Sequence, residues 1–292
     1  GPALAARFVT GAFLALVYPP ALKAMAGWFR VGRGLALGVM IGALTIGSAL
    51  PHLVNAFGGL DWRAALATTS GLTLIGGVIA DRACTAGPDA PAAAVVDPRQ
   101  IGAIVRNRSF LLATGGYFGH MWELYAMWAW IAAFYGDVFS SRVASLAAFS
   151  AIGIGAAGAV YAGLVSDRIG REVAARRALR WSATLALVTG FLVDAPWPIV
   201  VIAGLVWGFW VVADSAQFSA IVTEVVDPRY AGTALTLQLA SGFTLSVLTI
   251  FLVPEVRDAH GWGWAFLVLA PGPLLGSRAM SALRRRAITP GV

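Results

Sequence analysis

The chain has 292 residues, of which 59% are hydrophobic and 12% charged, and its mean hydropathy is +0.77. A soluble domain carries about 25% charged residues, so this composition excludes one and predicts an integral membrane protein. The net charge of +7 would suit a nucleic-acid partner, but the basic residues gather between apolar runs, so we interpret it as membrane topology. The single cysteine excludes an internal disulfide, and no Cys/His cluster has the spacing of a metal site. We therefore expect no metal, no cofactor and no nucleic acid.

Apolar runs long enough to cross a bilayer recur along the whole chain. A membrane-spanning helix needs about 17 to 25 residues. Nine runs meet this length: 3–27, 35–56, 64–80, 110–135, 144–165, 178–194, 199–222, 233–254 and 263–283. Lipid offers backbone groups no hydrogen-bond partners, and the runs lack the alternation of a barrel strand, so we predict nine transmembrane helices.

The arginines between these runs set the predicted orientation. Most of them fall in alternate connections on one side of the membrane, whereas the other side holds only Arg63, Arg142 and Arg257. The excess of positive charge marks the cytoplasmic side. We therefore expect a multi-pass protein of the plasma or inner membrane with its C-terminus in the cytoplasm and Gly1 outside.

Two short similarities indicate an internal repeat. The segment 33–37 before the second run returns in looser form at 231–235, and the segment 61–65 before the third run returns at 261–265, with a shared offset of about 200 residues. The first three runs would then correspond to the last three. Runs four to six would need partners before residue 1, which predicts twelve spans in two six-span halves. The expected divisions are 1–80, the second half of an N-terminal bundle; 81–109, a cytoplasmic linker; and 110–292, a C-terminal six-helix bundle.

A charged turn lies between the fifth and sixth predicted spans. It reads Gly163-Leu-Val-Ser-Asp167-Arg168-Ile-Gly170-Arg171, and it resembles the loop signature of the major facilitator superfamily, Gly-x-x-x-Asp-Arg-x-Gly-Arg. The resemblance implies an all-α membrane bundle of the major facilitator type, with nine transmembrane helices in this chain and twelve in the full length. The chain would match the fourth to twelfth helices of the family. The implied function is secondary active transport of a small solute.

We expect this turn to hold two helices together. The fold of the family places Asp167 beside the start of the eighth predicted span, near Gly232 and its neighbours at 231 and 233. A carboxylate at a helix start satisfies free backbone donors and is stabilised by the helix dipole, and Arg229 could add a charge-assisted bond. The alternative is a solvated aspartate balanced by Arg168 and Arg171.

Ionisable residues at membrane depth are costly and are candidates for function. His120 and Glu123 lie near the middle of the fourth predicted span, three residues apart and so on one helix face. Such a pair could load and unload a proton, with Glu123 as the main carrier. The alternatives are that His120 satisfies a backbone carbonyl and Glu123 a neighbouring helix.

The seventh predicted span carries a second polar stripe. Its members recur every three or four residues: Trp207, Trp210, Asp214 and Gln217. Aromatic rings stack on flat ligands while a carboxylate and an amide fix their orientation, so the stripe is typical of a cavity wall. The alternative is that the tryptophans pack against lipid or a neighbouring helix.

Arg7, in the first predicted span, resembles the arginine of the family's fourth helix, which is tied to proton coupling or to an anionic substrate. It could equally extend to lipid headgroups. By the same resemblance, the first, fourth and seventh predicted spans line a central cavity. We therefore expect a transporter of a small organic solute, anionic or aromatic, coupled to protons in a lipid bilayer. The alternatives are a non-transporting sensor or pseudo-transporter and, with less support, a membrane-embedded enzyme that uses His120 and Glu123.

Overall fold

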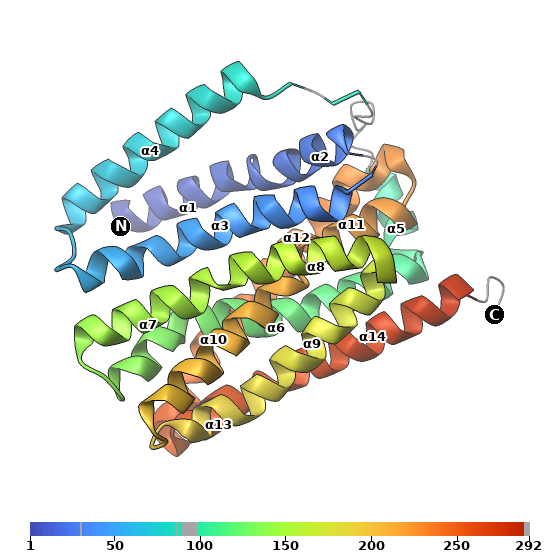
Figure 1. The fold of residues 1–292 in the computed structure, drawn as a ribbon. Helices are drawn as coiled ribbons and strands as arrows, with labels where there is room; N and C mark the ends of the chain where they lie inside the picture. The colour runs from blue at the N-terminus through green and yellow to red at the C-terminus, as the bar shows by residue number, and fades with distance from the viewer. Residues whose placement is uncertain (30, 86, 89–97, 289–292) are drawn as a thin grey trace.

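The computed structural model describes residues 1–29, 31–85, 87–88 and 98–288, and every regular element within these ranges is a helix. In chain order they are α1 (Pro2–Ala15), α2 (Tyr18–Trp28), α3 (Arg33–Ala56), α4 (Trp62–Ala83), α5 (Pro98–Arg106), α6 (Arg108–Gly136), α7 (Ser141–Gly153), α8 (Gly155–Ile169), α9 (Arg171–Val188), η1 (Thr189–Leu192), α10 (Trp197–Ala213), α11 (Ser215–Val225), η2 (Pro228–Tyr230), α12 (Ala231–His260), α13 (Trp262–Leu267) and α14 (Pro271–Ile288). The helices run roughly along one common direction and form an elongated bundle (Figure 1).

Seven stretches of the described chain are long and apolar enough to cross a membrane. They are Pro2–Leu22, Arg33–Ala56, Trp62–Ala83, Ser141–Ile169, Trp197–Val225, Pro228–His260 and Trp262–Ala287. The expected count of nine is not confirmed. The two expected spans outside the seven correspond to α6 and α9. The glycines, aromatic residues and buried charge of α6 dilute its hydropathy, and the first half of α9 is rich in arginine.

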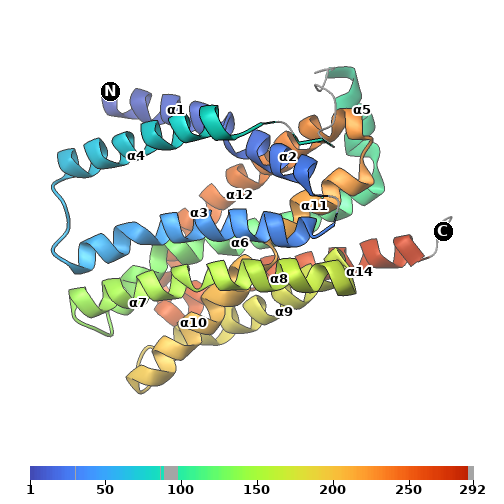
Figure 2. The same cartoon turned by 45° about the horizontal axis from the view of Figure 1, so that its top comes forward.

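The contact between α3 and α8 joins the first part of the chain to the rest. The two helices lie side by side in both ribbon views (Figures 1 and 2). Gly34 and Gly38 face α8: a Cβ on Gly34 would lie 2.6 Å from the carbonyl oxygen of Gly163, and one on Gly38 would lie 2.5 Å from that of Ala159. Glycine removes the side chain that would hold the backbones apart, which is how membrane helices reach close contact without a hydrophobic driving force.

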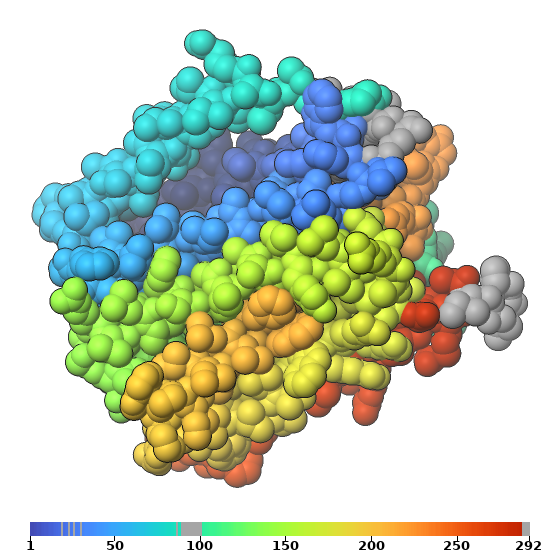
Figure 3. All heavy atoms as spheres, viewed as in Figure 1, coloured from blue at the N-terminus to red at the C-terminus, as the bar shows by residue number. Residues whose placement is uncertain are grey.

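The other helices of the first 83 residues pack less closely. Neither α1 nor α4 has a buried residue, and α4 stands apart from the rest of the bundle in Figure 1. The face seen in Figure 3 is hollowed between α4 and the segment α1–α3. The expected linker 81–109 overlaps the end of α4, the helix α5 and the start of α6, and its residues 86 and 89–97 lie outside the described ranges.

The bundle has two distinct ends. One end, which we call the arginine-rich end, holds the start of α3, the α8–α9 turn and the end of α14, and with them Arg33, Arg168, Arg171, Arg176 and Arg284 (Figure 1). The opposite end holds the junctions α6–α7 and α12–α13. There, Nη2 of Arg257 donates to Oδ2 of Asp137 at 2.8 Å, and Nε1 of Trp262 donates to the same oxygen at 2.7 Å. These donors, Trp262 first, hold the pKa of Asp137 below its ordinary value.

We predict that the α3–α8 contact tolerates no added side chain. Gly38→Ala should lower the free energy of unfolding by about 1 to 3 kcal/mol, because the new methyl meets the backbone of Ala159. Gly47→Ala on the same helix is the matched control, because nothing lies within 4 Å of its Cβ position. It should leave stability unchanged or raise it, since alanine favours helix. Thermal unfolding in detergent measures both variants, and an equal effect at the two positions would contradict the assigned contact.

Candidate functional site

A central cavity of about 590 Å³ lies between the helices of the first part of the chain and those of the second. Its walls come from α1 and α2, from α3, from α6, from the α10–α11 junction and from α12. The lining is Gly11, Leu14, Ala15, Tyr18, Ile41, Leu44, Thr45, Ser48, Tyr117, His120, Met121, Leu124, Tyr125, Trp128, Val212, Ser215, Thr236, Leu239, Ala240 and Phe243. The first, fourth and seventh predicted spans thus line the cavity, and the second and eighth join them.

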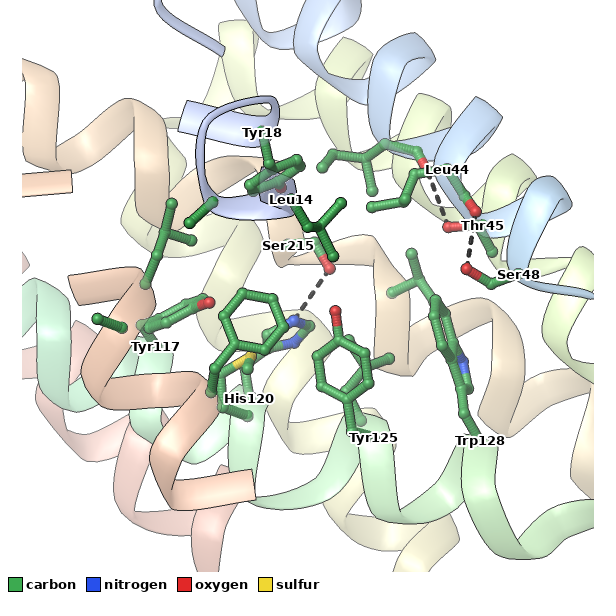
Figure 4. Close-up of a pocket in the computed structure, with 18 of the residues that line it drawn as sticks. Leu14, Tyr18, Leu44, Thr45, Ser48, Tyr117, His120, Tyr125, Trp128 and Ser215 are labelled. Carbon is green, nitrogen blue, oxygen red and sulfur yellow. Dashed lines mark hydrogen bonds between the residues drawn. The ribbon is translucent and has the colours of Figure 1, made fainter. Parts of the chain in front are cut away.

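One face of α6 supplies most of the aromatic wall. Tyr117, His120, Tyr125 and Trp128 project from this helix into the cavity and form a row in Figure 4. Sequence reasoning chose His120 together with Glu123 and missed Tyr117, Tyr125 and Trp128. The signal was present in the sequence, because tyrosine, histidine and tryptophan recur there at intervals of three to five residues.

His120 connects the cavity to a buried carboxylate. Its Nδ1 lies 2.8 Å from Oδ1 of Asp214, and its Nε2 lies 3.1 Å from the hydroxyl oxygen of Ser215, as the dashed line in Figure 4 marks. Both His120 and Asp214 are almost completely buried. Because a carboxylate beside Nδ1 favours the tautomer with its proton there, Nε2 is left to accept from Ser215. Ser215, His120 and Asp214 therefore form a continuous series of polar contacts that begins at the cavity.

A break in the helix places Asp214 and Ser215 in these positions. The helix α10 ends at Ala213 and α11 begins at Ser215, so Asp214 is the junction residue. Its carbonyl oxygen accepts from the amide of Gln217 at 2.9 Å, a three-residue bond that starts α11. Interrupted helices recur at the binding sites of transporters, where irregular backbone lines a cavity.

Glu123 lies behind this series of contacts, inside the C-terminal bundle. Its Oε2 accepts from the hydroxyl of Ser182 at 2.8 Å, and its Oε1 accepts from Nε1 of Trp207 at 2.6 Å. The side chain is almost fully buried and is not part of the cavity lining. Two residues three apart on a helix differ in direction by about 60°, and that rotation sends His120 towards the cavity and Glu123 towards α9 and α10.

The four residues of the expected stripe on the seventh span are not among the residues that line this cavity. Trp207 is fully buried and holds Glu123, while Gln217 is fully buried with no described hydrogen-bond partner for its amide. Trp210 stacks on the half-exposed Trp181, with ring centroids 6.0 Å apart. Because the helix breaks at Asp214, the spacing of three or four does not carry through, and the span contributes Val212 and Ser215 to the lining instead.

Arg7 does not reach the cavity in this structure. It is exposed on α1, a helix without buried residues. The next turn of the same helix does line the cavity, through Gly11. The role expected for Arg7 in binding an anion or a proton therefore has no contact to support it.

Asp167 of the charged turn accepts a hydrogen bond at the start of a helix, but this helix is not the one that we expected. The amide of Gly34 donates to Oδ1 of Asp167 at 3.3 Å, so the carboxylate lies at the start of α3 rather than at Gly232 and the start of α12. A contact between Asp167 and a helix start was therefore expected, but the helix is α3 and not α12. Arg171, whose Nη1 lies 3.6 Å from Oδ1 of Asp167, also donates from Nε to Glu224 at 2.7 Å.

The remaining residues of the turn have local roles. Gly163 meets the backbone of Gly34, and Gly170 adopts a φ of 92° between α8 and α9, a conformation that glycine allows at no steric cost. Arg168 is exposed. Arg229 does not contact Asp167 as expected but pairs with Asp227, and its side-chain and backbone donors lower the pKa of that carboxyl to about 2.

Apolar helices of spanning length gather around a central cavity, an architecture that membrane transporters share. A model of the Major Facilitator Superfamily matches residues 2–176, more than half of the chain. The chain therefore belongs to the Major Facilitator Superfamily. None of the curated proteins compared with the chain matches it.

We predict that Asp167 stabilises the arginine-rich end through Gly34. Asp167→Ala should lower the free energy of unfolding by about 0.5 to 2 kcal/mol, the usual loss when a helix-start acceptor is removed. Asp167→Asn should recover part of it, because the amide oxygen still accepts from Gly34. Asp81→Ala is the control, since Asp81 makes an exposed pair with Arg82 and such pairs contribute little. Equal thermal unfolding of the Asp167→Ala and Asp81→Ala variants would exclude the contact.

Proposed function

We propose that the protein is a secondary active transporter that moves a small organic solute through the central cavity and couples the movement to protons. The observation that carries the proposal is the cavity itself, which is enclosed by both parts of the chain and contains His120 linked to Asp214. The positive-inside rule supports a multi-pass protein of the plasma or inner membrane whose arginine-rich end, with the C-terminus, is cytoplasmic.

The lining supports an aromatic solute over an anionic one. Tyr18, Tyr117, Tyr125, Trp128 and Phe243 offer flat apolar surfaces for stacking. The hydroxyl groups of three further residues can fix the orientation of a polar substituent: Thr45, Ser48 and Ser215. No lysine or arginine is among the lining residues of the described chain, so a carboxylate on the solute would depend on protonated His120.

The proton role fits the pair His120–Asp214 better than Glu123. The pair reaches the cavity through Nε2 of His120, where a solute and water arrive, while Glu123 is held by Ser182 and Trp207 away from it. A proton taken up at His120 is stabilised by the carboxylate 2.8 Å away. A solute that displaces the hydroxyl of Ser215 from His120 would then change the proton affinity of the imidazole ring. Solute binding and protonation would thereby be coupled.

Charge-neutral variants separate the two carboxylates. We predict that Asp214→Asn abolishes solute-driven proton movement, with at least a tenfold loss of rate, whereas Glu123→Gln keeps it. The assay uses the protein in liposomes with a trapped pH-sensitive dye, and the solute is first chosen by thermal shift from a set of aromatic acids and neutral aromatics. Loss in Glu123→Gln with normal flux in Asp214→Asn would return the role to Glu123. Solute binding without any flux in the wild-type protein would favour the sensor alternative.

One observation favours the enzyme alternative. Ser215, His120 and Asp214 stand in the order of a serine nucleophile, its general base and the carboxylate that orients the base. A transporter uses these groups for binding and protons, so we predict that a fluorophosphonate probe leaves Ser215 unlabelled. Mass spectrometry of the treated protein measures the adduct. Labelling of the wild-type protein that disappears in His120→Gln would show an activated nucleophile and favour a membrane-embedded hydrolase.

A further inference from the structure

Four arginines gather on the neighbouring helices α9 and α14 at the arginine-rich end. The two helices pack against each other, and the start of α9 lies beside the end of α14 (Figures 1 and 2). Burial and the nearby positive charges of Arg180, Arg284 and Arg177 lower the pKa of Arg176. We call these four residues the arginine cluster.

The acidic groups nearby do not neutralise the cluster. Within the described chain, the one acidic group among the charges that face Arg176 is Glu172. Other carboxylates of this end are already engaged: Asp167 and Glu224 with Arg171, and Asp227 with Arg229. In addition, Nε of Arg176 is buried and has no hydrogen-bond partner among the described residues. A buried guanidinium donor without an acceptor is costly, and an anion with several oxygens would relieve both the unmet donor and the repulsion.

The surface beside the cluster has the character of a membrane interface. Trp181 is half-exposed, follows Arg180 directly and lies one helical turn from Arg177. It stacks on Trp210, which in turn meets the exposed Tyr161 edge-on. Tryptophan and tyrosine gather at the level of lipid headgroups, with apolar surface towards the acyl chains. The arginines of α9 that precede Trp181 lie nearer the arginine-rich end of the bundle. They therefore lie at the level where lipid phosphates are found.

We propose that the arginine cluster binds the headgroup of an anionic phospholipid, whose acyl chains lie along Trp181 and its aromatic neighbours. The binding is independent of the solute site, because none of these residues lines the central cavity. Charge complementarity selects an anionic over a zwitterionic headgroup. The phosphate supplies the acceptor that Nε of Arg176 needs, and the guanidinium groups of the other three arginines neutralise the remaining charge.

Native mass spectrometry of the detergent-solubilised protein, titrated with phosphatidylglycerol or phosphatidylcholine, tests the proposal. The wild-type protein should retain phosphatidylglycerol and not phosphatidylcholine. Each arginine near a membrane surface contributes about a factor of five to tenfold, so Arg176→Gln/Arg180→Gln should weaken retention on the order of 30-fold. The matched control is Arg285→Gln/Arg286→Gln, which removes the same charge from exposed positions of α14 that are not among the charges facing Arg176. It should retain the lipid.

Three outcomes would overturn the proposal. Equal loss in the two double variants would mean that the lipid responds only to net charge. Equal retention of the two lipids by the wild-type protein would remove the selectivity. A thermal shift produced by glycerol phosphate as large as that from phosphatidylglycerol would show a site for free phosphate esters and not for a lipid. If the Arg176→Gln/Arg180→Gln variant does not fold, Arg177→Gln/Arg284→Gln removes two charges of the same cluster and carries the same expectation.

Discussion

The close approach of α3 to α8 is the constraint on which the cavity depends. The first part of the chain touches the second mainly through α3, and at Gly34 and Gly38 the backbones leave no room for a Cβ. In lipid there is no hydrophobic force to drive two apolar helices together, so van der Waals packing of small residues and backbone hydrogen bonds must hold them. The bond from the amide of Gly34 to Asp167 adds a polar anchor at the end of this contact.

The same scarcity of partners in lipid explains the polar interior of the second part. A buried carboxylate is tolerated when donors surround it, and Glu123 has two, from Ser182 and Trp207. Asp214 is placed against His120 by the interruption between α10 and α11. Each buried acid thus sits where a neighbouring helix offers a partner, but only the pair with His120 reaches the cavity. Glu123 is therefore held in a fixed polar environment, whereas a solute in the cavity can alter the environment of Asp214 through His120.

Much of the fold could be predicted from the sequence, because membrane spans are set by length and composition within one segment. Both ends of α3 and α4, and the start of α12, fall within three residues of the ends of their apolar runs, and the charged turn does lie between two packed helices. The side of α6 that faces the cavity could not be predicted from the position of Glu123, because a rotation of about 60° depends on which neighbours α6 meets. The break at Asp214 could not be predicted, because no glycine or proline lies beside it in the sequence. The partner of Asp167 could not be chosen from the sequence alone, since Gly34 and Gly232 lie in similar short segments at the starts of two different helices.

The packing along α3 also indicates which end of the bundle is closed. A Cβ built on Gly34, Gly38 or Gly42, which share one face of α3, would lie 2.6, 2.5 or 3.3 Å from a backbone carbonyl oxygen of α8. The two backbones therefore approach most closely at the arginine-rich end, where Asp167 also holds Gly34. Towards the other end Ala49 is fully buried, and a hydrogen bond from Asn55 to Ser145 at 2.9 Å joins the two segments. A transporter opens its cavity to one side at a time, and the side with the loosest contact between its parts opens at the lowest cost. With the arginine-rich end in the cytoplasm, as proposed above, the closest backbone packing of α3 lies on the cytoplasmic side, which favours a state closed towards the cytoplasm.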